Sequence, residues 1–138
     1  MTRAFVVHWD PAEIGAKSAL VASCGVQVVG CEAEDGERAV AAMRLLDPNV
    51  LIVWLARLPS HGRVMAQAVR ATAWGRTLPV VFVEGDPGLV DDAKMARIRK
   101  AVPDAVLATP DRLQAAVVQA MLGAREAQQQ RLQRKAGQ

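Results

Sequence analysis

Five short apolar runs recur along the chain, separated by stretches in which apolar residues return every three or four positions. Runs without polar alternation are typical of strands covered on both faces, whereas the longer spacing is typical of helices that pack one face. The runs lie at residues 4–7, 26–30, 49–55, 79–83 and 105–108. Their alternation with helices predicts a doubly wound α/β fold, with a five-stranded parallel sheet in the order 2-1-3-4-5 inside a flavodoxin-like three-layer sandwich.

The stretches between the runs carry helix start and stop signals. Asp10 and Pro11 have the form of an N-cap followed by proline at the first helical position, and Gly25 marks the end of that helix. Asp35 is the predicted N-cap of the second helix, and Ser60 is that of the third. The predicted inner faces comprise Ala39, Val40, Met43 and Leu46 in the second helix, Val64, Ala68, Val69 and Thr72 in the third, and Leu113, Ala116, Val117, Ala120 and Met121 in the last.

The net charge of +3 lies at one end of the chain. Residues 1–122 are balanced, and the excess falls within residues 123–138, whose charged side chains are Arg125, Glu126, Arg131, Arg134 and Lys135. We therefore expect one domain over residues 1–122 and a polar, basic helical extension or frayed tail over residues 123–138. Leu132 is the only large apolar residue of that tail, which is too few for a coiled-coil seam. The balanced charge of the domain disfavours nucleic acid as its partner.

The apolar runs also bear on the compartment. They reach about seven residues, far short of the roughly 20 needed to cross a bilayer, so no membrane span is predicted. Arg3 and His8 interrupt the amino-terminal run, which does not resemble a signal peptide, and we expect a cytoplasmic protein.

Cys24 and Cys31 have no second pair and no nearby histidine. This favours buried, reduced thiols over a disulfide framework or a zinc site.

Several short motifs, taken in order, resemble those of receiver domains of bacterial response regulators, of the chemotaxis-regulator kind, over about residues 3–122. The motifs are Val6-Val7 before Asp10-Pro11, Asp47-Pro48-Asn49 before the third strand, Pro59 with His61-Gly62 after it, Leu78-Pro79 before the fourth strand, and Leu107-Ala108-Thr109-Pro110 after the fifth. The resemblance also implies a cis peptide bond between Thr109 and Pro110.

The resemblance implies a phosphorylation site whose parts are missing. In receiver domains an aspartate of the third strand accepts a phosphoryl group, an acidic pair after the first strand helps to hold Mg²⁺, and a hydroxyl residue and a lysine bind the phosphoryl oxygens. The motifs place the acceptor at Trp54 or Leu55 and the acidic pair at His8 and Trp9. They place the hydroxyl residue at Glu84 and the lysine at Thr109. Because a phosphoryl dianion needs metal and ammonium partners, the joint loss implies a degenerate pseudo-receiver without phosphorylation or Mg²⁺.

Each of these side chains has two interpretations. His8 and Trp9 either fill the volume of the missing carboxylates and metal or form a ligand platform. Asp10 is explained by its capping pattern, with metal ligation as the alternative. Glu84 is either a solvated acid or a partner of Arg57 or His8 that holds the loops in one state.

The resulting functional prediction is non-enzymatic: a phosphorylation-independent interaction module in bacterial signal transduction. The resemblance implies contact with a protein partner or a second copy through the fourth helix, fifth strand and fifth helix, here represented by Arg97, Lys100, Val106, Arg112 and Gln119. One alternative is a phosphorelay receiver with a displaced acceptor at Asp10, Asp86 or His8. Another is a flavodoxin-like domain that binds a small ligand, although no glycine-rich phosphate loop follows the first strand. No nucleophile–base pair is visible, which disfavours an enzyme.

Overall fold

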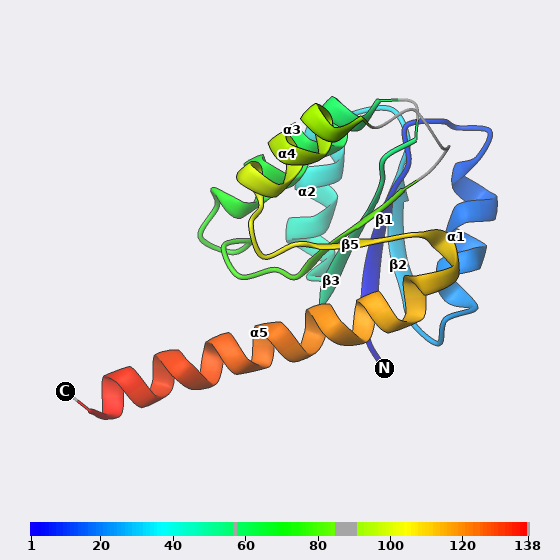
Figure 1. Ribbon diagram of the computed structural model, residues 1–138. Helices are drawn as coiled ribbons and strands as arrows, with labels where there is room; N and C mark the ends of the chain where they lie inside the picture. The colour runs from blue at the N-terminus through cyan, green and yellow to red at the C-terminus, as the bar shows by residue number, and fades with distance from the viewer. Residues whose placement is uncertain (57, 85–90, 138) are drawn as a thin grey trace.

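The computed structural model describes residues 1–56, 58–84 and 91–137 of the chain. It contains a five-stranded parallel sheet in the order β2-β1-β3-β4-β5, which confirms the predicted topology (Figure 1). The strands are β1 (Arg3–Val7), β2 (Gln27–Glu32), β3 (Val50–Trp54), β4 (Val80–Val83) and β5 (Val106–Ala108). The helices are α1 (Ile14–Ala22), α2 (Gly36–Leu46), α3 (Pro59–Arg70), α4 (Asp92–Ala101), the short 3₁₀ helix η1 (Pro110–Arg112) and α5 (Leu113–Ala136).

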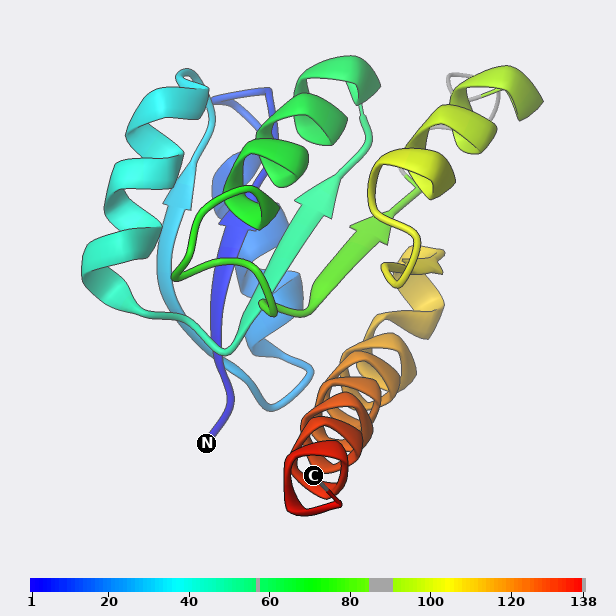
Figure 2. The same ribbon diagram turned by 90° about the vertical axis from the view of Figure 1, so that its left-hand side faces the viewer.

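The helices cover both faces of the sheet. Figure 2 shows α2, α3 and α4 in front of the sheet, with α1 behind it. Two apolar clusters correspond to these layers: one joins the sheet to α2, α3 and α4, and the other joins it to α1 and α5. Right-handed crossovers between parallel strands produce this arrangement.

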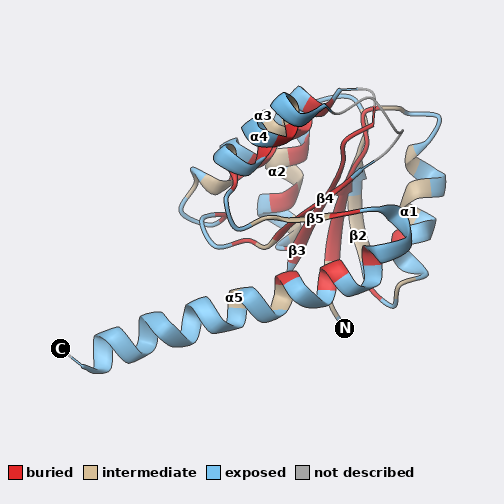
Figure 3. Cartoon of the chain, viewed as in Figure 1, coloured by how far each residue is buried: buried red, intermediate tan, exposed pale blue. Residues whose placement is uncertain are grey.

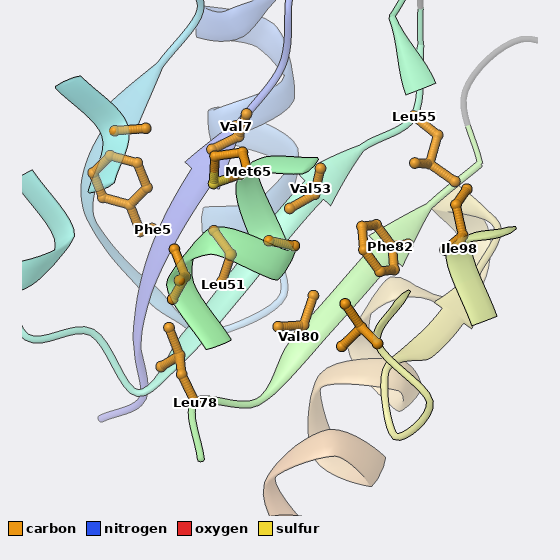
Figure 4. Packing of buried hydrophobic residues seen from close by; sticks show 14 of the residues in the cluster. Phe5, Val7, Leu51, Val53, Leu55, Met65, Leu78, Val80, Phe82 and Ile98 are labelled. Carbon is orange, nitrogen blue, oxygen red and sulfur yellow. The ribbon is translucent and has the colours of Figure 1, made fainter. Parts of the chain in front are cut away.

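The central strand β3 supplies both clusters, because successive side chains point to opposite faces. Leu51 and Val53 lie in the cluster with α2, α3 and α4, whereas Ile52 and Trp54 lie in the cluster with α1 and α5. Figure 4 shows the first cluster, in which the side chain of Met65 from α3 packs over the strands. Every residue of β3 is buried, as its continuous apolar sequence predicts.

Two helix predictions are wrong in detail. Asp10 does not cap α1 directly: its Oδ1 accepts a hydrogen bond from Ala12 N at 3.0 Å and forms a turn, so that the helix starts at Ile14. Helix α3 begins at Pro59 after Leu58, not after a Ser60 cap.

The inner stripe of α3 also differs from the prediction. The buried residues of this helix are Pro59, Gly62, Met65, Ala66 and Val69. Val69 was predicted correctly, but Val64 and Ala68 face solvent. Gly62 explains the shift, because a Cβ there would lie 2.7 Å from Val53 Cγ1, and its absence lets the helix approach the sheet along that side.

The other helix predictions agree with the structure. The Asp35 side chain accepts from the backbone N–H groups of Glu37 and Arg38 and caps α2, whose Ala39 and Met43 are buried. Helix α5 buries Leu113, Ala116, Val117 and Ala120, as predicted.

The carboxyl-terminal region differs from the prediction at Pro110 and ends in one long helix. No peptide bond among the described residues is cis, so the predicted cis bond before Pro110 is wrong. Pro110 instead opens the trans-linked turn η1, where its fixed φ suits the first helical position. Helix α5 then continues without a break to Ala136, and its distal half is exposed all round (Figure 3).

The cysteines are free thiols, but they are not buried as predicted: Cys24 is half-buried and Cys31 is exposed on edge strand β2. The edge position explains the exposure, because one side of β2 has no neighbouring strand. Within the described ranges, no helix is long and apolar enough to cross a membrane.

Candidate functional site

The centre of the sheet's carboxyl edge is built from buried aromatic side chains. His8 follows β1 and is 1% exposed, and Trp54 ends β3 and is completely buried. Their ring centroids lie 6.1 Å apart at an interplanar angle of 47°. Lys17 of α1 places its Nζ 5.0 Å from the centroid of the Trp54 ring, within the range of a cation–π interaction. We call His8, Lys17 and Trp54 the aromatic plug.

Trp9 occupies the opposite face of the same edge. Its ring meets His61 of α3 edge-to-face, with centroids 6.2 Å apart. The position of a Cβ on Gly62 would be 3.7 Å from Trp9 Nε1, and a Cβ on Gly36 would be 4.0 Å from the far end of the ring. Trp9 is therefore enclosed by the first turns of α2 and α3, where an acidic pair would need open access to metal.

The hydrogen bonding of the two indole N–H groups bears on whether the tryptophan side chains fill the core or bind a ligand. Among the described residues, neither Trp9 Nε1 nor Trp54 Nε1 has a hydrogen-bond acceptor, although both atoms are buried. A buried, unpaired donor costs about 1–3 kcal/mol, which the apolar contacts of a large ring outweigh. The structure thus shows both rings packed within the apolar core.

The β4–β5 end of the edge has a different character. Glu84 and Thr109 are both exposed, and Glu84 N donates to Ala108 O at 2.8 Å, which extends the pairing of β4 with β5. Thr109 Oγ1 donates to the Asp111 carboxylate. This hydrogen bond, together with the backbone N–H of Asp111, lowers the pKa of that carboxyl. Glu84 and Thr109 line one groove of about 350 Å³ beside β5 and α5.

The β2 end of the edge is organised around Glu32. Its Oε2 accepts from the backbone N–H groups of Ala33, Glu34 and Asp35 at 3.0–3.2 Å, and its carboxylate pairs with Arg38 at 3.2 Å. Burial raises the pKa of Glu32, but the backbone hydrogen bond from Glu34 and the Arg38 side chain outweigh it, so the pKa lies below its ordinary value. This carboxylate closes the loop into α2.

The positions at which the motifs place the phosphoryl acceptor lie in the core of the described structure. Trp54 and Leu55, the two positions at which the motifs place the acceptor, are both 0% exposed and carry no oxygen. Among the described residues, no group of three or more His, Cys, Asp and Glu side chains is placed to hold a metal ion. Arg57 and Asp86, invoked for an ion pair with Glu84 and for a displaced acceptor, lie outside the described residues.

The comparisons with known proteins give the fold. No protein-family model matches the sequence, and no curated protein matches it. The signal receiver domain of a modulated diguanylate cyclase from Desulfovibrio desulfuricans G20 matches with a TM-score of 0.71 and 21% identity, over 92% of this chain and 98% of that one. Chemotaxis protein CheY4 of Vibrio cholerae matches with a TM-score of 0.68 and 17% identity, over 87% of this chain and 98% of that one. The chain has the receiver fold.

A third match is the receiver domain of NarL from Mycobacterium tuberculosis, with a TM-score of 0.61 and 21% identity over 90% of this chain and 96% of that one. These likenesses cover nearly all of each receiver domain, so the fold is shared from β1 into α5. At such identity they concern the fold, and function depends on the side chains described above.

Within this receiver fold, three of the five predicted interface residues come together. Val106, Arg112 and Gln119 line the same groove as Glu84 and Thr109. Arg97 and Lys100 are exposed on α4. Arg97 lines a shallow hollow on α4 next to the start of α3, with Pro59, Ser60 and Arg63.

Sequence reasoning missed Lys17 and Gly62. Lys17 meets Trp54 from a helix 37 positions earlier in the chain, and nothing in the local pattern of α1 distinguishes this lysine from a solvated one. Gly62 does carry a signal, because a glycine inside a helix that packs on a sheet often marks close approach.

Proposed function

We propose that this chain is a pseudo-receiver: a cytoplasmic, non-enzymatic module of bacterial two-component signal transduction that acts by protein contact and without phosphorylation. The receiver fold supports the signalling class. The single observation that carries the rest is the burial of Trp54 and Leu55, which leaves no acceptor at the carboxyl end of β3.

The electrostatics of the site support the same proposal. Glu84 occupies the position of a phosphoryl-binding hydroxyl, and its negative charge would repel a phosphoryl group. The Lys17 ammonium lies over the indole face of Trp54, and Trp54 or Leu55 stands at the acceptor position. We therefore expect the domain to keep one conformation instead of switching between two.

The proposed contact surface is the groove between β5 and α5 together with the outer face of α4. Val106 supplies apolar area, whereas Arg112, Arg97 and Lys100 supply positive charge. This composition suits a protein partner with an acidic, partly apolar surface, because complementary charge steers association. Self-association of two such basic faces would bring like charges together.

Intact-mass spectrometry tests the absence of phosphorylation. The chain is incubated with acetyl phosphate and Mg²⁺, and CheY4 is treated in parallel as a positive control. We expect no phosphoryl adduct on this chain. An adduct would support the displaced-acceptor alternative, and its loss in the Asp10→Asn variant would place the acceptor at Asp10.

Sedimentation velocity with and without Mg²⁺ and beryllofluoride tests the permanent state. We expect the same sedimentation coefficient in both conditions, because the aromatic plug leaves no carboxylate for the mimic to bind. A shift that requires the mimic would contradict the proposal and show that the site still binds phosphoryl-like groups.

A further inference from the structure

Helix α5 has two apolar faces, and only one of them is packed. Leu113, Ala116, Val117 and Ala120 face the sheet. On the opposite side of the same turns, Val118 and Leu122 are 55% and 51% exposed. An ordinary surface helix shows one apolar stripe and a polar outer face, so the second stripe needs its own explanation.

The second stripe continues into the distal half of the helix. At 100° per residue, the positions that share a face with Val118 and Leu122 are Arg125, Gln129, Leu132 and Ala136. Their alternating spacing of three and four residues is that of a coiled-coil seam, and Leu132 is 59% exposed. The tail alone has one large apolar residue, but the seam gains two more from the half of α5 that is anchored on the sheet. We call these six residues the outer seam.

The geometry points to a second copy of this chain as the occupant of the outer seam, paired antiparallel through α5. About 12 residues of α5, from Arg125 to Ala136, are exposed all round, and a solvated helix of that length is marginal without a partner. Arg131 and Arg134 project from the side away from the seam and Lys135 lies on its flank, so none of the three enters the seam.

The positive charge of Arg125 favours the antiparallel orientation. A parallel pair would stack Arg125 of one copy on Arg125 of the other. An antiparallel pair with its two-fold axis near residue 127 brings Leu122 opposite Leu132, Val118 opposite Ala136, and Arg125 opposite Gln129, each contact occurring twice. The packed bodies lie at opposite ends of such a pair and do not meet.

The pairing is independent of the function proposed above. It uses the outer seam, whereas the proposed partner surface uses the β5–α5 groove together with Arg97 and Lys100, and these two residues of α4 share no element with the seam. Variants can therefore separate the two. In sedimentation equilibrium of the full chain over a concentration series, we expect a reversible monomer–dimer equilibrium. Leu122→Asp with Leu132→Asp should weaken dimer formation by at least about tenfold, because each carboxylate would be buried against an apolar side chain.

Leu45→Asp serves as the matched control, because Leu45 is an equally apolar and even more exposed leucine on α2. It should leave the dimer unchanged, and circular dichroism should show both variants folded. A chain that stays monomeric throughout the series would overturn the inference. So would a dimer that survives the seam variants and is lost on Arg97→Glu with Lys100→Glu, a result that would place self-association on the α4 face and contradict the like-charge argument made for that face.

Spin labels measure the orientation. In a Cys24→Ser, Cys31→Ser background, single cysteines replace Gln128 or Lys135, which lie on the same flank of the seam one heptad apart. Antiparallel pairing offsets the two labels along the axis by about 3 Å at position 128 and about 24 Å at position 135, at 1.5 Å rise per residue. Parallel pairing gives equal separations at both positions and would overturn the assigned orientation.

Discussion

The centre and the flanks of the sheet's carboxyl edge differ in the chemistry of their side chains. At the ends of β1 and β3 the side chains are His8, Trp9 and Trp54, which are all buried, and the two tryptophans belong to the apolar clusters. At the ends of β2 and β4 they are Glu32, whose side chain is 10% exposed and paired with Arg38, and Glu84, which is exposed. The comparison teaches that the middle of this edge is continuous with the core, whereas its flanks carry charged side chains. Substitutions in the two regions should therefore differ in magnitude and in kind.

The largest effect is expected from Trp54→Ala. Removing a fully buried indole should lower the free energy of unfolding by about 3–5 kcal/mol, measured by urea denaturation followed by far-ultraviolet circular dichroism. Trp54→Phe should cost much less, because it keeps most of the apolar volume and removes the unpaired N–H. Trp74→Ala, at a position 37% exposed, is the control and should change stability by about 1 kcal/mol. Equal losses at the two tryptophans would contradict a core role for the centre.

An intermediate, pH-dependent effect is expected at the β2 flank. Because the folded pKa of Glu32 is lowered, its carboxylate stabilises the fold above its unfolded pKa, and this stabilisation is lost as pH falls through the lowered folded pKa. Glu32→Gln should therefore be less stable than the unaltered chain at neutral pH and lose less stability in acid.

Thermal unfolding over a pH series down to the acidic range checks this effect. Glu34→Gln is the matched control, since Glu34 is an exposed glutamate two positions along. Parallel curves for the unaltered chain and the Glu32→Gln variant would show that the carboxylate does not organise this loop.

The smallest effect is expected from Glu84→Gln. The side chain is exposed, so the free energy of unfolding should change by less than about 0.5 kcal/mol. A larger loss would show that Glu84 holds the loops through an ion pair, the alternative raised from the sequence. Differential scanning calorimetry of both forms resolves the difference, with Thr109→Ala as a neighbouring surface control.

The order and type of the elements could be predicted because β3 and its neighbours are continuous apolar runs. Asp35 and Pro48 also mark the start and the end of the second helix. The inner stripe of α3 could not, since a glycine that permits close approach shifts which residues meet the sheet. The position of each motif could be read from the sequence, whereas the burial and contacts of its side chains could not. That Trp54 is buried against Lys17 depends on packing between segments distant in sequence, which no local pattern records.

Family resemblance gave one wrong detail, the cis bond before Pro110. In this chain the proline opens η1 with a trans bond. Thr109 precedes the proline, at the position where the motifs place the lysine of a receiver domain. A motif therefore predicts a backbone state less well when the side chain that accompanies it has changed.

The three tryptophans give the molecule its own optical reporters. The chain has no tyrosine, so its near-ultraviolet absorption and fluorescence come almost entirely from indoles. These lie at graded depths, with Trp54 sealed, Trp9 nearly so and Trp74 partly open to solvent. A collisional quencher will reach Trp74 first, whereas the emission of Trp54 and Trp9 will respond when the carboxyl edge of the sheet opens. Loosening at the two ends of the sheet can thus be followed separately, without an added dye.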